Sequence, residues 1–292
     1  MDEPALTPSA PTPAPAPADQ HAAWNGPEGA SWAEHSARTV PGGDFSADVL
    51  AAAGIGHAER VLDIGCGTGG LTLDAARVAV DGHALGIDLS EVMIARAREA
   101  ATSSRIANVS FTVDDAATHR YDPAGIDVAL SHFGAMFFPD PVGAFSNITT
   151  ALRPGGRLVV VCPAAMDRCD WYGVPLTALS GTAPTPETAP SAMFSLSEPA
   201  VVHRVLADAG LGRVEVEPLE GSLWFGADAD RAAEMFLGSG PVRGFLQRTP
   251  SMSEDAAFDI LREAVSPFLA ADGIRLPGAH WLVRAERPGT GS

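Results

Sequence analysis

The chain has 292 residues, with 36 Asp and Glu against 19 Arg and no Lys, which gives a formal net charge of -17. Such a surface repels phosphate, so we expect neither nucleic acid nor an anionic membrane as a partner. An apolar fraction of 46% can build a sizeable core, and no apolar run approaches the roughly 20 residues of a membrane-spanning helix. Composition therefore favours a soluble globular protein.

Residues 1–20 alternate Pro with small residues and predict a disordered tail. The segment lacks the basic start and apolar centre of a signal peptide, so we expect a cytoplasmic protein. The three cysteines (Cys66, Cys162 and Cys169) form no CxxC pair and are expected to be reduced thiols, without a disulfide framework or a zinc site.

After the tail, residues 27–38 could form a short helix that carries Trp32 and His35. Asp44 is a plausible N-cap for a further helix, which we expect to run to about Ala53 and to end at Gly54.

From Arg60 the chain alternates short apolar runs with helical ones, the pattern of βα units and a parallel sheet. We expect strands at 61–64, 84–87, 109–113, 126–131 and 157–162, helices at about 70–79, 91–101 and 140–152, and a turn at 154–156. The fold class is therefore α/β, with a Rossmann-like, doubly wound sheet.

Beyond Cys162 the regularity weakens. We expect a helix at about 198–209, strands at 214–216 and 223–225, three helical pieces within 228–270 and a final strand at 280–285, antiparallel to an otherwise mostly parallel sheet. Insertions between late strands often cover a pocket, so residues 228–275 are predicted to form a helical substrate lid. Residues 21–292 then form one domain, which opens with an N-terminal helical flap.

One motif carries chemistry: residues 61–70 read VLDIGCGTGG, a GxGxG turn between a strand and a helix. Glycines let the backbone approach a ligand, and the helix N-terminus offers free N–H groups. Asp88 ends the next strand, where a carboxylate accepts hydrogen bonds from ribose hydroxyls. Gly70 also completes a dinucleotide fingerprint, so the turn alone fits a nicotinamide cofactor or S-adenosylmethionine.

Asp63 separates these two cofactors. A carboxylate two residues before the glycines is badly placed beside a pyrophosphate, but it can orient the turn and serve a cationic amino-acid ligand. Asp63 therefore favours S-adenosylmethionine.

Four segments in order resemble the motifs of the class I S-adenosylmethionine-dependent methyltransferases. They read VLDIGCGTGG, GIDLSEVMIARAR, VSFTVDDAATHRY, and YDPAGIDVALSHFGAMFFPDP followed by ALRPGGRLVVV. The resemblance runs from about Trp24 to the C-terminus. Within the class, the chain looks like the bacterial small-molecule and natural-product methyltransferases related to those of quinone biosynthesis.

The resemblance implies that S-adenosylmethionine is the cofactor and S-adenosylhomocysteine its product. It places ribose binding at Asp88 and the adenine edge near Asp115. The full set of implied cofactor-binding residues is Asp63, Gly65, Cys66, Gly67, Gly69, Asp88, Leu89, Met93, Asp115, Ala116 and Ser131.

His132 is a departure from the family, whose members often have Arg after the serine of the fourth strand. An imidazole can titrate near neutrality, and this position lies at the carboxyl end of a predicted strand. We expect His132 to act as a general base or to orient the substrate, with a packing role as the alternative. His119 and His35 are weaker candidates, expected at the surface.

Apolar candidates remain for the substrate pocket. Trp24 and Trp32 either close over the cofactor or anchor the N-terminal segment, and Met136 and Phe137 form a pocket wall or core. Cys66 is expected to be a small apolar filler. No His, Asp or Glu grouping has metal-ligand spacing, so no metal is expected.

The sequence thus predicts an enzyme that transfers a methyl group to a small, largely apolar metabolite, with O-methylation favoured. Alternatives are N- or C-methylation, a cofactor-retaining cyclase that no longer methylates, and a nicotinamide-dependent dehydrogenase. We expect a monomer or homodimer with a small-molecule substrate as its only partner.

Overall fold

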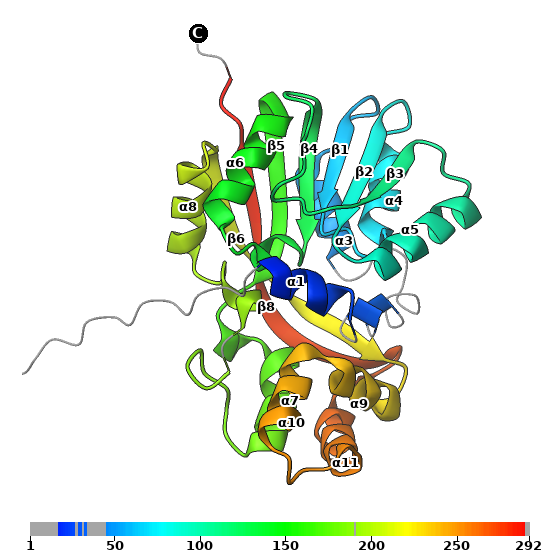
Figure 1. The fold of residues 1–292 in the computed structure, drawn as a ribbon, viewed down its shortest axis with the longest axis vertical. Helices are drawn as coiled ribbons and strands as arrows, with labels where there is room; N and C mark the ends of the chain where they lie inside the picture. The colour runs from blue at the N-terminus through cyan, green and yellow to red at the C-terminus, as the bar shows by residue number, and fades with distance from the viewer. Residues whose placement is uncertain (1–16, 27–28, 31, 34–44, 190, 290–292) are drawn as a thin grey trace, which may run out of the picture.

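The computed structural model of the chain describes residues 17–26, 29–30, 32–33, 45–189 and 191–289. Its centre is a sheet in the order β3-β2-β1-β4-β5-β8-β6, with the two-residue β7 paired to β8 (Figure 1). The strands are β1 Arg60–Ile64, β2 His83–Asp88, β3 Val109–Val113, β4 Ile126–His132, β5 Leu152–Pro163, β6 Gly212–Gly226, β7 Leu269–Ala270 and β8 Gly273–Glu286.

The first five strands are parallel, and β8 is antiparallel to both β5 and β6. The helices are α1 Pro17–Trp24, α3 Ser46–Ala53, α4 Gly70–Val78, α5 Glu91–Ser104, α6 Pro141–Ala151, α7 Asp170–Ser180, α8 Pro199–Asp208, α9 Ala229–Gly238, α10 Gly240–Arg248 and α11 Glu254–Val265. The predicted Rossmann-like, doubly wound sheet with an antiparallel last strand is confirmed. No described helix is long and apolar enough to cross a membrane.

The central strands β1, β4 and β5 are mostly buried, because their largely apolar side chains point to alternate faces of the sheet and both faces are covered. In β1, Leu62 joins a cluster with Phe145 of α6 and Leu206 of α8, whereas its neighbour Val61 joins the opposite cluster with Leu71 of α4. Helices on both faces leave the carboxyl ends of the parallel strands open for a site.

A further apolar cluster lies at one end of β6 and β8. These two strands form a long antiparallel pair, from Gly212 opposite Glu286 to Gly226 opposite Ile274. This ribbon carries α7, α9, α10 and α11, which we call the cap (Figure 1). The cap has its own core, built around Phe236 and Leu261.

Several predicted boundaries are wrong. The two short strands at 214–216 and 223–225 are one strand, because β8 pairs with β6 past Pro218. The predicted turn at 154–156 is an irregular part of β5, in which Gly155 has a φ of 74° and donates to the carbonyl of Arg287. The sequence also gave no sign of α7, whose interior holds Pro175.

At the N-terminus, the predicted tail ends too late: residues 17–20 begin α1, and Gln20 is buried. Residues 1–16 lie outside the described residues, as do His35, Asp44 and most of the predicted helix at 27–38. Helix α3 ends at Gly54, as predicted, with a φ of 53°.

Candidate active site

A cavity of about 740 Å³ opens at the carboxyl ends of the parallel strands, between the sheet and the cap. Its volume is typical of small-molecule sites. One part lies against β1, β2 and β3, where the sequence analysis predicts the cofactor, and we call it the cofactor half. The other part lies against the cap, and we call it the acceptor half. His132 lines the cavity at the end of β4, the strand that lies between β1 of the cofactor half and the strands β5, β8 and β6 that lead to the cap.

The glycine turn forms the floor of the cofactor half. Gly65 and Gly67 have φ values of 66° and 54°, which favour glycine. A Cβ atom on Gly65 would lie 2.8 Å from the Cα of Gly134, so the β1 and β4 turns approach as closely as their backbones allow. Gly69 is not on the cavity wall; a Cβ there would meet the ring of Phe111 at 2.8 Å.

Asp88 fixes this turn. Its Oδ2 accepts from the Gly67 N–H at 2.9 Å and its Oδ1 from the Ser90 N–H at 2.8 Å. Burial raises the pKa of the Asp88 carboxyl, and these backbone donors oppose that rise. Each oxygen keeps a lone pair for a ribose hydroxyl. Leu89 and Met93, predicted beside the cofactor, also line the cavity.

Asp63 lies on the cavity wall and is only 1% exposed. Burial raises its pKa to about 7, although the Thr72 hydroxyl donates to Oδ2 at 2.6 Å. A nearby cation would favour the carboxylate form, so Asp63 is suited to the ammonium group of an amino-acid ligand.

Adjacent carboxylates at the end of β3 take different roles. Asp115 Oδ1 accepts from the Ala117 N–H at 2.9 Å, and both Asp115 and Ala116 line the cavity. Asp114 pairs with Nδ1 of His119 at 2.6 Å, which lowers the pKa of Asp114. His119, predicted at the surface, is thus engaged and partly buried.

The surroundings of two other predicted cofactor residues, Ser131 and Cys66, indicate that they support the fold. Ser131 is fully buried and not on the cavity wall: its hydroxyl donates to the Ile64 carbonyl at 2.8 Å and accepts from the Ala135 N–H at 2.9 Å. Cys66 lines the cavity, and burial raises the pKa of its thiol, as expected of an apolar filler and not of a nucleophile.

Aromatic rings surround His132. The centroid of Phe133 lies 4.6 Å from that of His132, and Phe45 lies at 6.5 Å. Phe133 has a φ of 59°, an uncommon value for a bulky residue, so β4 ends in a strained conformation. Sequence reasoning missed Phe45 and also His280 of β8, whose ring lies 4.6 Å from Phe45.

The two tryptophans of the N-terminal segment lie on the cavity wall, and Trp24 also packs against the turn after β4. Trp24, Trp32, Met136 and Phe137 all line the cavity. The Trp24 and Phe137 rings meet edge to face at 5.2 Å, and Gln20 donates to the Phe137 carbonyl at 3.1 Å.

Helices α9 and α10, which contribute to the wall, lie within the predicted lid at 228–275, whereas the sequence analysis missed the contributions of α7 and β6. This part of the wall includes Trp171 and Tyr172 of α7, Trp224 of β6 and Phe236 of α9. No motif marks these residues. Among the described residues, no three His, Cys, Asp or Glu side chains are grouped so as to hold a metal ion.

Comparison with known proteins gives the class. Residues 55–188 match the family model described as a methyltransferase domain. The chain is 39% identical over 106 residues to aklanonic acid methyltransferase of a Streptomyces species, covering 36% of this chain and 48% of that protein. It is 32% identical over 104 residues to nocamycin O-methyltransferase of Saccharothrix syringae, covering 35% and 37%.

Solved structures share the fold. Phosphoethanolamine N-methyltransferase 2 of Haemonchus contortus, solved with S-adenosylhomocysteine, matches with a TM-score of 0.60 and 20% identity over 93% of this chain and 60% of that one. A putative methyltransferase of Bacillus halodurans matches with a TM-score of 0.56 and 18% identity, covering 84% and 100%.

Residues 55–188 therefore carry a methyltransferase domain, and the chain is similar in sequence and in fold to S-adenosylmethionine-dependent methyltransferases. S-adenosylmethionine, not a nicotinamide cofactor, is the cofactor of this family, and the buried Asp63 and the Asp88-held turn suit it. The chain spans about half the length, or less, of the curated relatives it matches.

Proposed function

We propose that this protein transfers a methyl group from S-adenosylmethionine to an oxygen atom of a small molecule, with His132 as the general base. The observation that carries the proposal is the position of His132, which lines the cavity at the end of β4, between β1 of the cofactor half and the strands that lead to the cap. A base at this position would lie close to both the methyl donor and the acceptor.

When bound, S-adenosylmethionine would supply an electrophilic methyl group, which passes in line to the acceptor oxygen as the methyl–sulfur bond breaks and S-adenosylhomocysteine leaves. The residues of this chain do the rest. Asp88 would hold the ribose and Asp63 would face the ammonium group, so these two residues would fix the cofactor's position from two sides. His132 takes the proton from the acceptor hydroxyl, and the cap and Trp24 keep water away.

The test compares His132→Ala and His132→Gln with His83→Gln, a control at the opposite end of the sheet whose ring bonds to Ser110. We expect both His132 variants to lower kcat by about 100-fold or more while cofactor affinity stays within twofold, since general bases contribute roughly that much. Full turnover by His132→Ala with intact cofactor binding would remove the base role.

The acceptor atom is tested separately, by mass spectrometry of candidate metabolites incubated with methyl-labelled S-adenosylmethionine. We expect the label on oxygen. Label on nitrogen or carbon would favour the other transferase alternatives, and product formed from unchanged S-adenosylmethionine would indicate a non-methylating cyclase.

A further inference from the structure

Aromatic residues are concentrated around the cavity. Ten of the 19 Phe, Trp and Tyr residues of the chain line it, although the chain has only 7% aromatic residues. They come from the N-terminal segment, the end of β4 and the turn after it, β6, and the cap. Aromatic walls provide large, rigid apolar surfaces that pack well against flat rings.

Charge divides the cavity into its two halves. The carboxylates of Asp63, Asp88, Asp114 and Asp115 all belong to the cofactor half. Among the described residues between 163 and 242 that line the acceptor half, none is Asp, Glu, Arg or His. A charged acceptor would thus enter a wall that offers it no partner of opposite charge, and burial of an unpaired charge is costly.

The few polar side-chain groups of the cap wall are mostly engaged within the protein. The Tyr172 hydroxyl donates to the Ala189 carbonyl at 3.1 Å, Trp224 Nε1 to the Asp272 carbonyl at 2.9 Å, and the Ser239 hydroxyl to the Phe236 carbonyl at 2.7 Å. Binding in this half must therefore come mainly from apolar contact.

We propose that the acceptor is an uncharged molecule with aromatic rings, whose ring system packs under the cap while its hydroxyl group lies beside His132. This inference rests on the proposed methyl transfer and names its substrate class. It excludes phosphorylated and zwitterionic acceptors, which the net charge of -17 also disfavours when they are anionic.

The experiment is calorimetry on the full chain saturated with S-adenosylhomocysteine, whose binding is measured first. The probes are 2-naphthol, its anionic analogue 6-hydroxynaphthalene-2-sulfonate, and phosphoethanolamine. We expect the sulfonate to bind at least tenfold more weakly than 2-naphthol, and phosphoethanolamine to give no heat.

Two substitutions test whether the rings of the acceptor pack against the cap wall. Met235 of α9 lines the cavity, whereas Met252 is partly buried against the cap core away from the cavity. We expect Met235→Arg to weaken 2-naphthol at least tenfold and Met252→Arg to leave it within twofold, with S-adenosylhomocysteine affinity unchanged in both. If Met235→Arg fails to fold, Leu223→Arg, on β6 of the same wall, takes its place.

The outcomes separate the two proposals. Failure of S-adenosylhomocysteine to bind would overturn the proposed methyl transfer. Tight cofactor binding together with a sulfonate that binds as well as 2-naphthol, absence of 2-naphthol binding, or equal effects of the two Arg substitutions would overturn only the substrate class.

Discussion

At the scale of single residues, we expect the buried Asp63 to couple cofactor binding to pH. Its pKa in the folded protein is raised from 3.8 to about 7, chiefly by burial. A raised pKa means that this group favours the fold most below about pH 4, and that its contribution is lost as the pH rises through about 7. The cofactor's ammonium group reverses this preference, since it attracts the carboxylate.

We therefore expect cofactor affinity to increase as the pH rises through about 7. Asp63→Asn should flatten this dependence and weaken binding by roughly tenfold above pH 8, because one unit of pKa is about 1.4 kcal/mol. Without cofactor, the same substitution should raise Tm at pH 8 and have little effect near pH 4. Calorimetric titrations and melting curves across this range provide the check; an unchanged pH dependence in Asp63→Asn would contradict the role.

Asp88 is the second residue whose loss should be costly. Asp88→Ala removes the acceptor for the Gly67 and Ser90 N–H groups as well as for the ribose. Hydrogen bonds to charged groups contribute about 1.5–3 kcal/mol each, so we expect cofactor affinity to fall by about 10- to 100-fold or more. Asp122→Ala, at an exposed loop position, is the control. Unchanged binding in Asp88→Ala would refute the assignment of this motif.

At the scale of elements, α1 and Asn25 bridge two turns on opposite sides of the cofactor half. Asn25 Nδ2 donates to the Leu89 carbonyl at 2.9 Å, and its Oδ1 accepts from the Glu91 N–H at 2.9 Å. On the other side, Gln20 and Trp24 contact Phe137. The segment thus joins the turn after β2 to the turn after β4, across the cavity.

This arrangement predicts that cofactor binding protects α1. Hydrogen exchange of residues 17–26 should slow when S-adenosylhomocysteine binds, and Asn25→Ala should restore part of the exchange while lowering affinity several-fold, since two hydrogen bonds are lost. Val80→Ala, at an exposed position before β2 that does not line the cavity, should behave as the unmodified protein. If the hydrogen-exchange rate of α1 is the same with and without S-adenosylhomocysteine, this bridging role is wrong.

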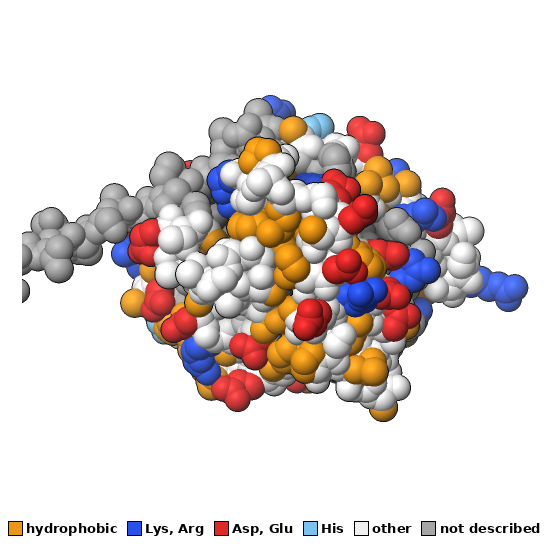
Figure 2. All heavy atoms as spheres, turned by 90° about the horizontal axis from the view of Figure 1, so that it is seen from below, with side chains coloured by type: hydrophobic (Ala, Val, Ile, Leu, Met, Phe, Trp, Pro, Cys, Tyr) orange, Lys and Arg blue, Asp and Glu red, His pale blue; other side chains and the backbone are white. Residues whose placement is uncertain are grey.

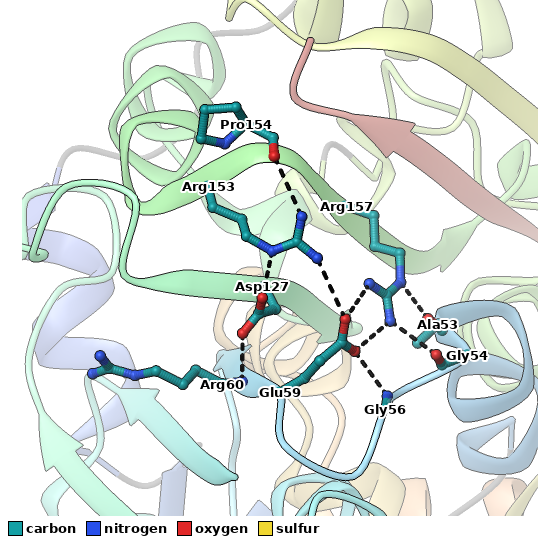
Figure 3. A network of polar contacts seen from close by, with 9 residues as sticks. All are labelled: Ala53, Gly54, Gly56, Glu59, Arg60, Asp127, Arg153, Pro154 and Arg157. Atoms are coloured by element: carbon teal, nitrogen blue, oxygen red, sulfur yellow. Dashed lines mark hydrogen bonds and ion pairs between the residues drawn. The ribbon is translucent and has the colours of Figure 1, made fainter. Parts of the chain in front are cut away.

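At the scale of the whole molecule, stability and function lie at opposite ends of the sheet. Figure 3 shows the end away from the cavity, where Glu59 lies between Arg157 and Arg153. The Arg157 guanidinium also donates to the Ala53 and Gly54 carbonyls, so this network ties the end of α3 to β1 and β5. Its hydrogen bonds lower the pKa of the Glu59 carboxyl.

A lowered pKa means that the contribution of Glu59 is present above about pH 4.5 and is lost as the pH falls through the folded value. We expect Glu59→Gln to lower Tm by about 2–4 °C at pH 7, to have a smaller effect near pH 3, and to leave cofactor affinity unchanged. Melting curves at both pH values check this. An equal loss at both would show that packing, not charge, is what Glu59 provides.

The outside and the inside of the cap differ in charge. Figure 2 shows the cap end of the molecule from outside, where Asp and Glu side chains are scattered among hydrophobic ones. The wall that the cap turns toward the cavity is uncharged among the described residues. The acidic side chains seen on this face of the cap thus lie outside the cavity, and we expect the acceptor half to select by shape and apolar contact.

The sequence by itself determined the order of the βα units and the glycine turn, because both depend on local periodicity and on residues close together in the chain. Asp63, Gly67 and Asp88 were found this way. Only the tertiary structure decided which aromatic residues form the acceptor half. The β6–β8 ribbon brings Trp171, Trp224 and Phe236 to the end of β4, and Gln20 reaches Phe137 across 117 residues. Contacts at such separations leave no local pattern, since each residue alone resembles ordinary core.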